Sequence, residues 1–148
     1  MHHYTESGLD NIYLVNGYEV TEEDGEEYIS YTNFDGIQQA IAVAICNQKS
    51  WMTPQQLKFI RKEFNLSQSA LGLLLYCDRQ SIARWEKGET DIPALADITL
   101  RALYLESIQE ESHVRLTIDS LVDAEIADMQ ASIHLEEKDG KWKAITAA

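Results

Sequence analysis

The stretch that decides the fold is residues 57–89, LKFIRKEFNLSQSALGLLLYCDRQSIARWEKGE. Apolar residues recur in it three or four positions apart, which is the spacing that lines one face of a helix. The pattern is interrupted at Asn65 and again at Tyr76-Cys77, where a tight turn is expected. The stretch therefore predicts three short helices, with the second and third joined by that turn.

Capping signals predict where these helices begin and end. Thr53-Pro54 is a start signal, because Thr caps a helix N-terminus and Pro suits the first helical position. Ser67 and Asp78 are the expected N-caps of the next two helices, and Gly88 is expected to close the last one. A longer fourth helix is expected to open at Pro93, with apolar positions at Leu95, Ile98, Leu100, Leu103, Tyr104 and Leu105.

The stretch resembles the repressor/Cro-type (XRE) helix-turn-helix family. In that family the second and third helices of the unit form the helix-turn-helix, and the third lies in the major groove of duplex DNA. The resemblance therefore implies a lambda-repressor-like bundle that binds double-stranded DNA. It rests on Leu66-Ser67-Gln68, Leu71, Leu75, Ile82 and the run Arg84-Trp85-Glu86-Lys87-Gly88.

The resemblance also implies which side chains contact DNA. Arg79 and Gln80 stand where the third helix enters the groove, and Arg84 lies one turn later. Arg pairs bidentately with guanine and Gln with adenine, and each good pair is worth about 1–3 kcal/mol of discrimination. The other expected contacts, to phosphate or to a base, are Gln68, Ser81, Lys87 and Lys49.

Three further features concern the bundle itself. Arg61 and Glu86 match a structural ion pair of the family, which holds the first helix to the third. Gly72 occupies a usual Ala position, at a helix cost of up to about 1 kcal/mol. Tyr76 replaces the common Gly of the turn, where φ is positive and a Tyr is strained. A reshaped turn is therefore expected.

Charge is distributed unevenly along the 148 residues. The formal net charge is −13, but residues 1–48, 49–88 and 89–148 carry −9, +4 and −8 respectively. Positive charge thus lies on the one segment expected to meet phosphate. The acidic flanks should weaken non-specific affinity for DNA, and they are suited to attract a basic protein partner.

The N-terminal segment is expected to combine strands with one helix. Residues 12–15 and 18–20 are predicted strands joined by Asn16-Gly17, a strong hairpin signal. Residues 21–27 are an expected acidic loop, residues 28–31 a third strand, and residues 8–11 a turn. Asp35 is the expected N-cap of a helix that ends near Asn47, and His2-His3 is expected to be a frayed terminus.

The C-terminal segment is expected to form a short helix and a hairpin. Val114, Ile118 and Leu121 suit an amphipathic helix, and Asp139-Gly140 marks a turn between alternating strands. An isolated hairpin is marginal, so this one should dock on the N-terminal strands or on another subunit. The expected fold is mainly α with small β elements (α+β), divided into residues 1–50, 51–108 and 109–148.

A second resemblance covers more of the chain. The start HYTESGLDNIYLVNGYEV, residues 3–20, followed by a helix-turn-helix, is similar to antitoxins of the MqsA/YgiT class. Zinc-binding cysteines are common in that class and are missing here, so the chain resembles its zinc-less branch. The resemblance implies a homodimer that represses its own operon from a palindromic operator, and an N-terminal domain that binds a toxin.

Three classes of function follow from these patterns. The first is a dimeric transcriptional repressor; the second is an interaction module or antitoxin that neutralises a small basic toxin, with DNA binding secondary. An enzyme is disfavoured, because no phosphate loop or catalytic motif is present. No metal site or cofactor is expected, and Cys46 and Cys77 should be small buried thiols. A cytoplasmic location without membrane insertion is expected, because no apolar run approaches roughly 20 residues.

Overall fold

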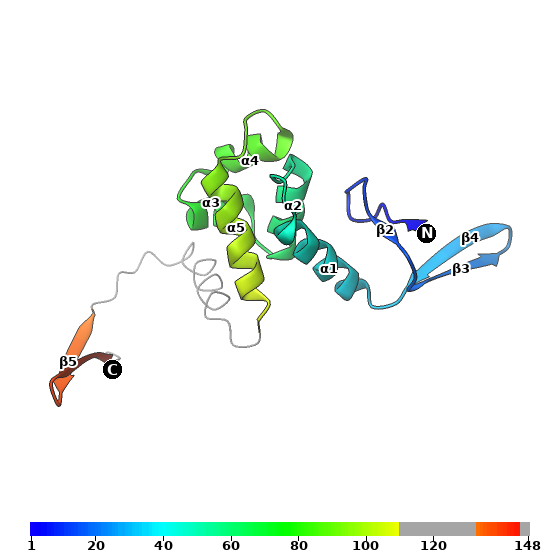
Figure 1. Ribbon diagram of the computed structural model, residues 1–148. Coiled ribbons are helices and arrows are strands. Elements are labelled where there is room, and N and C mark those ends of the chain that lie inside the picture. The colour runs from blue at the N-terminus through cyan, green and yellow to red at the C-terminus, as the bar shows by residue number, and fades with distance from the viewer. Residues whose placement is uncertain (110–132, 146–148) are drawn as a thin grey trace.

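The computed structural model describes residues 1–109 and 133–145 and shows a helical bundle with small paired strands (Figure 1). The expected mainly helical α+β fold is confirmed. The helices are α1 (Phe34–Asn47), α2 (Pro54–Glu63), α3 (Gln68–Leu75), α4 (Arg79–Lys87) and α5 (Ala94–Ser107). The strands are β1 (His2–His3), β2 (Tyr13–Leu14), β3 (Tyr18–Glu23), β4 (Glu26–Tyr31), β5 (His134–Lys138) and β6 (Lys141–Ile145).

The helices share one hydrophobic core. Leu57 of α2, Leu71 of α3 and Ile82 of α4 are fully buried in it, together with Leu100 of α5. α1 packs on α2 and α5, and Tyr4 of the N-terminal segment is buried in the same cluster. This core therefore includes residues from both sides of the boundary expected at residue 50, and the division into domains stays a prediction.

The predicted helix ends of the central unit are confirmed. Thr53 forms a capping box with Gln56, in which each side chain accepts a hydrogen bond from the other residue's backbone N–H. Ser67 and Asp78 cap α3 and α4, and Gly88 closes α4 with φ 74°. These ends depend on hydrogen bonds within three or four residues, so local sequence determines them.

The hairpin predicted at Asn16-Gly17 is wrong. β3 pairs with β4 through Asp24-Gly25, in the segment that was expected to be a loop, and β2 pairs instead with β1. Asp24 and Gly25 both have positive φ, 54° and 80°, as a two-residue hairpin turn requires. At the other candidate only Gly17 has positive φ. The third strand expected at residues 28–31 lies within β4.

Two further N-terminal expectations are corrected. His2 and His3 are not frayed: they form β1, and His2 Nε2 lies 2.9 Å from the Tyr31 hydroxyl. The N-cap of α1 is Asn33 rather than Asp35, with its side chain accepting from the Gly36 backbone N–H at 3.1 Å. A Cβ on Gly36 would lie 2.3 Å from the Asn33 amide, so the absent side chain makes room for this cap.

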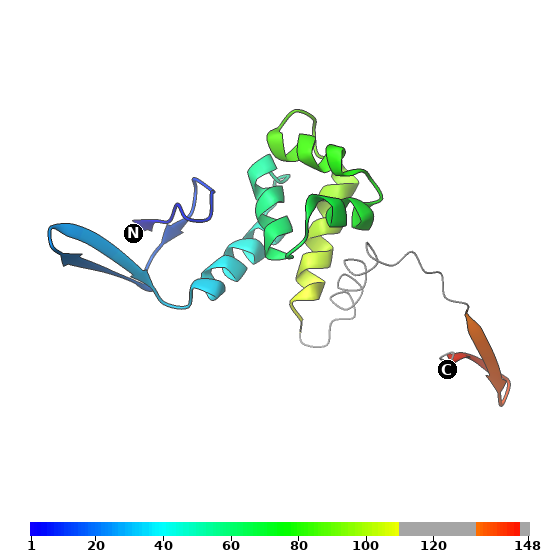
Figure 2. The ribbon, with the colours of Figure 1, turned by 180° about the vertical axis from the view of Figure 1, so that it is seen from behind.

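The C-terminal hairpin forms as predicted, with β5 and β6 joined at Asp139-Gly140. It lies at the far side of the bundle from β3 and β4 in both ribbon views (Figures 1 and 2), so docking on the N-terminal strands is not observed. The helix predicted around residues 114–122 lies outside the described residues. None of the described helices is long and apolar enough to cross a bilayer.

Candidate DNA-binding face

The exposed face of α4 carries most of the expected DNA contacts. Ile82 and Trp85 are buried against the bundle, which turns the opposite face of the helix outward. Gln80, Arg84 and Lys87 are exposed at spacings of four and three residues, so they share that outward face. Arg79 is also exposed and Ser81 is half-buried. The geometry thus brings the expected base-contacting side chains together at one surface.

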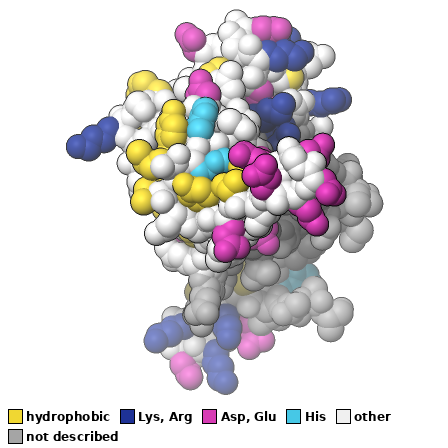
Figure 3. All heavy atoms as spheres, turned by 90° about the vertical axis from the view of Figure 1, so that its right-hand side faces the viewer, with side chains coloured by type: hydrophobic (Ala, Val, Ile, Leu, Met, Phe, Trp, Pro, Cys, Tyr) yellow, Lys and Arg dark blue, Asp and Glu magenta, His cyan; other side chains and the backbone are white. Residues whose placement is uncertain are grey.

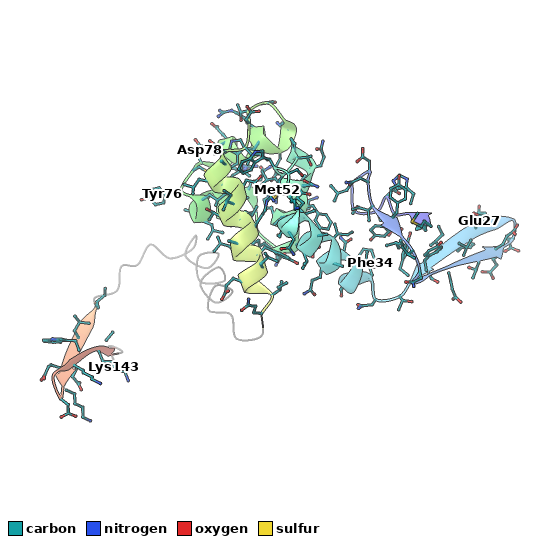
Figure 4. All side chains as sticks on the ribbon, viewed as in Figure 1. Glu27, Phe34, Met52, Tyr76, Asp78 and Lys143 are labelled. Atoms are coloured by element: carbon teal, nitrogen blue, oxygen red, sulfur yellow. The ribbon has the colours of Figure 1, made fainter. Side chains whose placement is uncertain are left out.

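The first turn of α4 is fixed by its cap. The Asp78 side chain accepts a hydrogen bond from the Ser81 backbone N–H at 2.7 Å. That hydrogen bond is the main cause that lowers the pKa of the Asp78 carboxyl, so the cap is charged near neutral pH. Asp78 lies at the junction of α3 and α4 (Figure 4). Because it fixes the first turn of α4, it also sets the direction in which the side chains of Arg79 and Gln80 project from the helix.

An ion-pair network holds α4 to α2. Arg61 donates from Nε and Nη2 to the two carboxylate oxygens of Glu86, at 2.6 and 3.0 Å, and from Nη1 to the Leu66 carbonyl at 2.9 Å. The Gln68 side chain also donates to Glu86, at 3.2 Å. Gln68 was expected to contact phosphate; here its amide is bound to Glu86, so a phosphate contact by that amide would compete with this bond.

The turn before α4 keeps a glycine-like backbone in spite of Tyr76. Tyr76 has φ 61° and ψ 44°, and the Cys77 N–H donates to the Gly72 carbonyl at 2.8 Å. Gly88 ends α4 in the same way, with the Glu89 N–H donating to the Arg84 carbonyl at 3.0 Å. The turn is therefore not reshaped; the strain falls on Tyr76, whose side chain is 99% exposed and points away from the bundle (Figure 4).

Replacing Tyr76 with Gly is expected to stabilise the protein by about 1 kcal/mol, because Gly adopts positive φ without a steric cost. The measurement is the free energy of unfolding from urea titration. The slope of that free energy against urea concentration should not change. Tyr76→Asn should give a smaller gain, since Asn tolerates this conformation better than Tyr. A loss of stability in Tyr76→Gly would show that the aromatic ring makes a compensating contact.

The packing of α3 against the following turn explains why residue 72 is a glycine, which the sequence alone did not reveal. A Cβ at this position would lie 2.6 Å from the Cys77 carbonyl oxygen, and that oxygen belongs to the backbone of the turn. The usual Ala therefore does not fit here unless the turn moves. The helix-propensity cost of Gly72 is thus offset by a close approach of α3 to the turn.

We expect Gly72→Ala to lower the free energy of unfolding by about 1–3 kcal/mol, the usual range for overpacking. Denaturant titration measures this directly. Ser69→Ala, an exposed substitution in the same helix, is the matched control and should change stability by less than about 0.5 kcal/mol. Equal stabilities for Gly72→Ala and the wild type would contradict the close approach.

The segment before α2 is held by α5, an arrangement the sequence analysis missed. Asp97, only 1% exposed, accepts from the Met52 backbone N–H at 2.7 Å and pairs with Arg101 at 2.6 Å. Arg101 also donates to the Gln48 and Ser50 carbonyls, at 2.9 and 2.6 Å. The exposed Lys49 lies on this clamped segment, so its backbone is fixed relative to the bundle. An acid and a base four residues apart was the available signal.

Burial raises the thiol pKa of both cysteines. Cys46 is buried and Cys77 half-buried, and burial raises the pKa of the Cys46 thiol to about 11. Such a thiol stays protonated and unreactive at neutral pH. Among residues 1–109 and 133–145, no group of three or more His, Cys, Asp or Glu side chains could hold a metal ion.

Residues 57–98 match the model of a helix-turn-helix family. The match runs from Leu57 in α2 through α3 and α4 into α5. It therefore includes the exposed face of α4 and the ion pair that holds α4 to α2. It supports a helix-turn-helix of the Cro/XRE type and a DNA-binding transcriptional regulator. No curated protein and no solved structure matches the chain.

Proposed function

We propose that the protein is a sequence-specific transcriptional repressor that reads base edges in the major groove with α4. The observation that carries this proposal is the exposed row Gln80, Arg84 and Lys87 on a rigidly capped helix. Arg79 and Gln80 are the first two residues of α4, at the end of the helix that would enter the groove first. Ser81, Lys87, Lys49 and Gln68 would contact phosphate or a base and set the register of the protein on the duplex.

The salt dependence of binding tests this proposal. The probe is duplex DNA from upstream of the protein's own gene, titrated at a series of salt concentrations. If Lys49 and Lys87 of each protomer neutralise phosphates, a dimer releases about four counterions and the logarithmic slope should be near −4. A flat response would contradict direct phosphate contact and would leave a protein-interaction module as the better description.

We propose that the repressor acts as a homodimer on a palindromic operator, because one helix-turn-helix contacts only a short half-site. The outer face of α5 supports this proposal, since Leu95 and Ile98 are exposed there. The exposed Trp51 lines a cavity together with Ala94 of the same helix. Leu95→Glu is expected to shift the sedimenting species from dimer to monomer, while Glu106→Gln on the same helix should not. A wild-type monomer on its operator would contradict the proposal.

A second candidate function is that of an antitoxin that represses its own operon and neutralises a small basic toxin. The distribution of charge favours it: residues 1–48 carry −9 and contain no Lys or Arg. Complementary charge speeds the encounter of two proteins and disfavours wrong partners. Co-expression with the product of the neighbouring gene tests it. A basic protein that co-purifies and loses its toxicity supports the role, and the lack of any such neighbour contradicts it.

A further inference from the structure

Residues 18–31 form an acidic arm, the β3–β4 hairpin, which extends away from the helical bundle (Figures 1 and 2). Every residue from 19 to 30 is exposed. A two-stranded hairpin is marginally stable in water when nothing packs on it. The base of the arm is nevertheless anchored, because His2 lies against Tyr18, with ring centroids 5.0 Å apart, and its Nε2 is within hydrogen-bond distance of Tyr31.

One face of the acidic arm combines apolar and acidic side chains in a fixed order. Side chains on a strand alternate between faces, so directly paired residues two positions apart share a face. Tyr18 pairs with Tyr31 at the base, Val20 with Ile29 next, and Glu22 with Glu27 towards the tip. Val20 and Ile29 are 52% and 40% exposed, so they form a small apolar patch next to the carboxylates of Glu22 and Glu27.

The tip of the acidic arm carries charge that the rest of the arm does not balance. Glu22 lies opposite Glu27 and Glu23 opposite Glu26, and like charges placed directly opposite are destabilising. No Lys or Arg occurs among residues 1–48 to offset them. The described residues also contain no carboxylate group arranged to hold a metal ion, so a cation is not the expected counter-charge.

A groove of about 600 Å³ lies at the base of the acidic arm, between residues 11–17 and α1. Its floor is apolar, and its lining includes Ile12, Leu14, Ile37 and Ala40. Viewed from this side, hydrophobic side chains gather beside a group of Asp and Glu side chains (Figure 3). The apolar groove and the acidic arm therefore lie next to one another on this surface.

We propose that the acidic arm and its basal groove are the docking surface for a basic protein. Lysine or arginine side chains of the partner would meet Glu22 and Glu27 on the face that carries Val20 and Ile29, and Glu23 and Glu26 beside the turn at the tip. Apolar side chains of the partner would cover the Val20–Ile29 patch and enter the groove. Charge complementarity selects this occupant, since duplex DNA would be repelled by the same carboxylates. The inference rests on the basic partner proposed above and adds where that partner binds.

The test uses peptides selected from a random displayed library against the full-length protein. We expect the selected peptides to combine Lys or Arg with an aliphatic or aromatic residue. Changing the four tip glutamates to Gln should weaken their binding by about tenfold or more, because the attraction is largely electrostatic. Ile29→Thr, which keeps a strand-forming residue, should weaken it about threefold. Glu136→Gln with Glu137→Gln, on the other exposed hairpin, should leave binding unchanged.

Each remaining outcome would overturn the proposal. Neutral or acidic selected peptides would contradict the chemistry of the partner. Basic peptides that bind the tip variant as tightly as the wild type would place the partner elsewhere, while leaving the antitoxin role intact. Salt-sensitive self-association that disappears in the tip variant would show that the arm binds the basic helix of a second copy instead. Operator affinity, measured in parallel, reports separately on the repressor proposal.

Discussion

Replacing Glu86 with Ala is expected to lower the free energy of unfolding by about 3–5 kcal/mol, the range seen when one partner of a buried ion pair is removed. Arg61 is a buried residue, and two of its three observed hydrogen bonds go to Glu86. The variant would leave the guanidinium with only the Leu66 carbonyl. Gln68 would lose its partner as well, so the effect extends from α2 to the start of α3.

Urea unfolding monitored by circular dichroism measures this loss. Glu106→Ala, which removes an exposed acid from α5, is the control and should change stability by less than about 0.5 kcal/mol. Replacing both members of the pair, Arg61→Met with Glu86→Leu, should recover most of the stability, because it leaves no unpaired charge. A loss below about 1 kcal/mol in Glu86→Ala would mean that the pair behaves as a surface salt bridge.

Arg84→Ala is expected to weaken binding to the operator by about 5- to 150-fold, which corresponds to the 1–3 kcal/mol of one bidentate base contact. The side chain of Arg84 is exposed, and only its backbone carbonyl takes part in closing α4. The fold should therefore survive the substitution. Fluorescence anisotropy with operator and with unrelated DNA measures both affinities.

Arg84→Lys separates base recognition from charge. Lys keeps the positive charge but lacks the planar fork of donors, so affinity for unrelated DNA should stay within about twofold while operator affinity falls. The ratio of operator affinity to affinity for unrelated DNA decides whether Arg84 recognises a base or only supplies charge. Equal weakening on both DNAs would assign Arg84 to phosphate, and no change on either would remove it from the interface.

Local sequence predicted the central unit because its decisive interactions are local. Thr53, Ser67 and Asp78 each cap a helix through a backbone N–H three residues further on, and Gly88 closes α4 through its own positive φ. Such bonds require only a residue type at a given offset. The outward row of Gln80, Arg84 and Lys87 was predictable for the same reason, since helical periodicity alone sets it.

The N-terminal pairing could not be chosen from the sequence, because two turn signals compete. Asn16-Gly17 and Asp24-Gly25 both favour a hairpin, and the second has the longer strands on either side of it. Asp97 and Arg101 show a different limit. They fix a segment about fifty residues away in the chain through backbone carbonyls and an N–H, and no residue type in that segment reveals those bonds.

Selection of duplex DNA from a random library, carried out with the wild type and with Arg84→Ala, tests the central claim most directly. If α4 reads base edges as proposed, the wild type should enrich a two-fold symmetric site with a guanine preference in each half. Arg84→Ala should then lose that preference at one symmetric pair of positions and keep the others. Failure of the wild type to enrich any sequence, or an identical site from both proteins, would contradict the account.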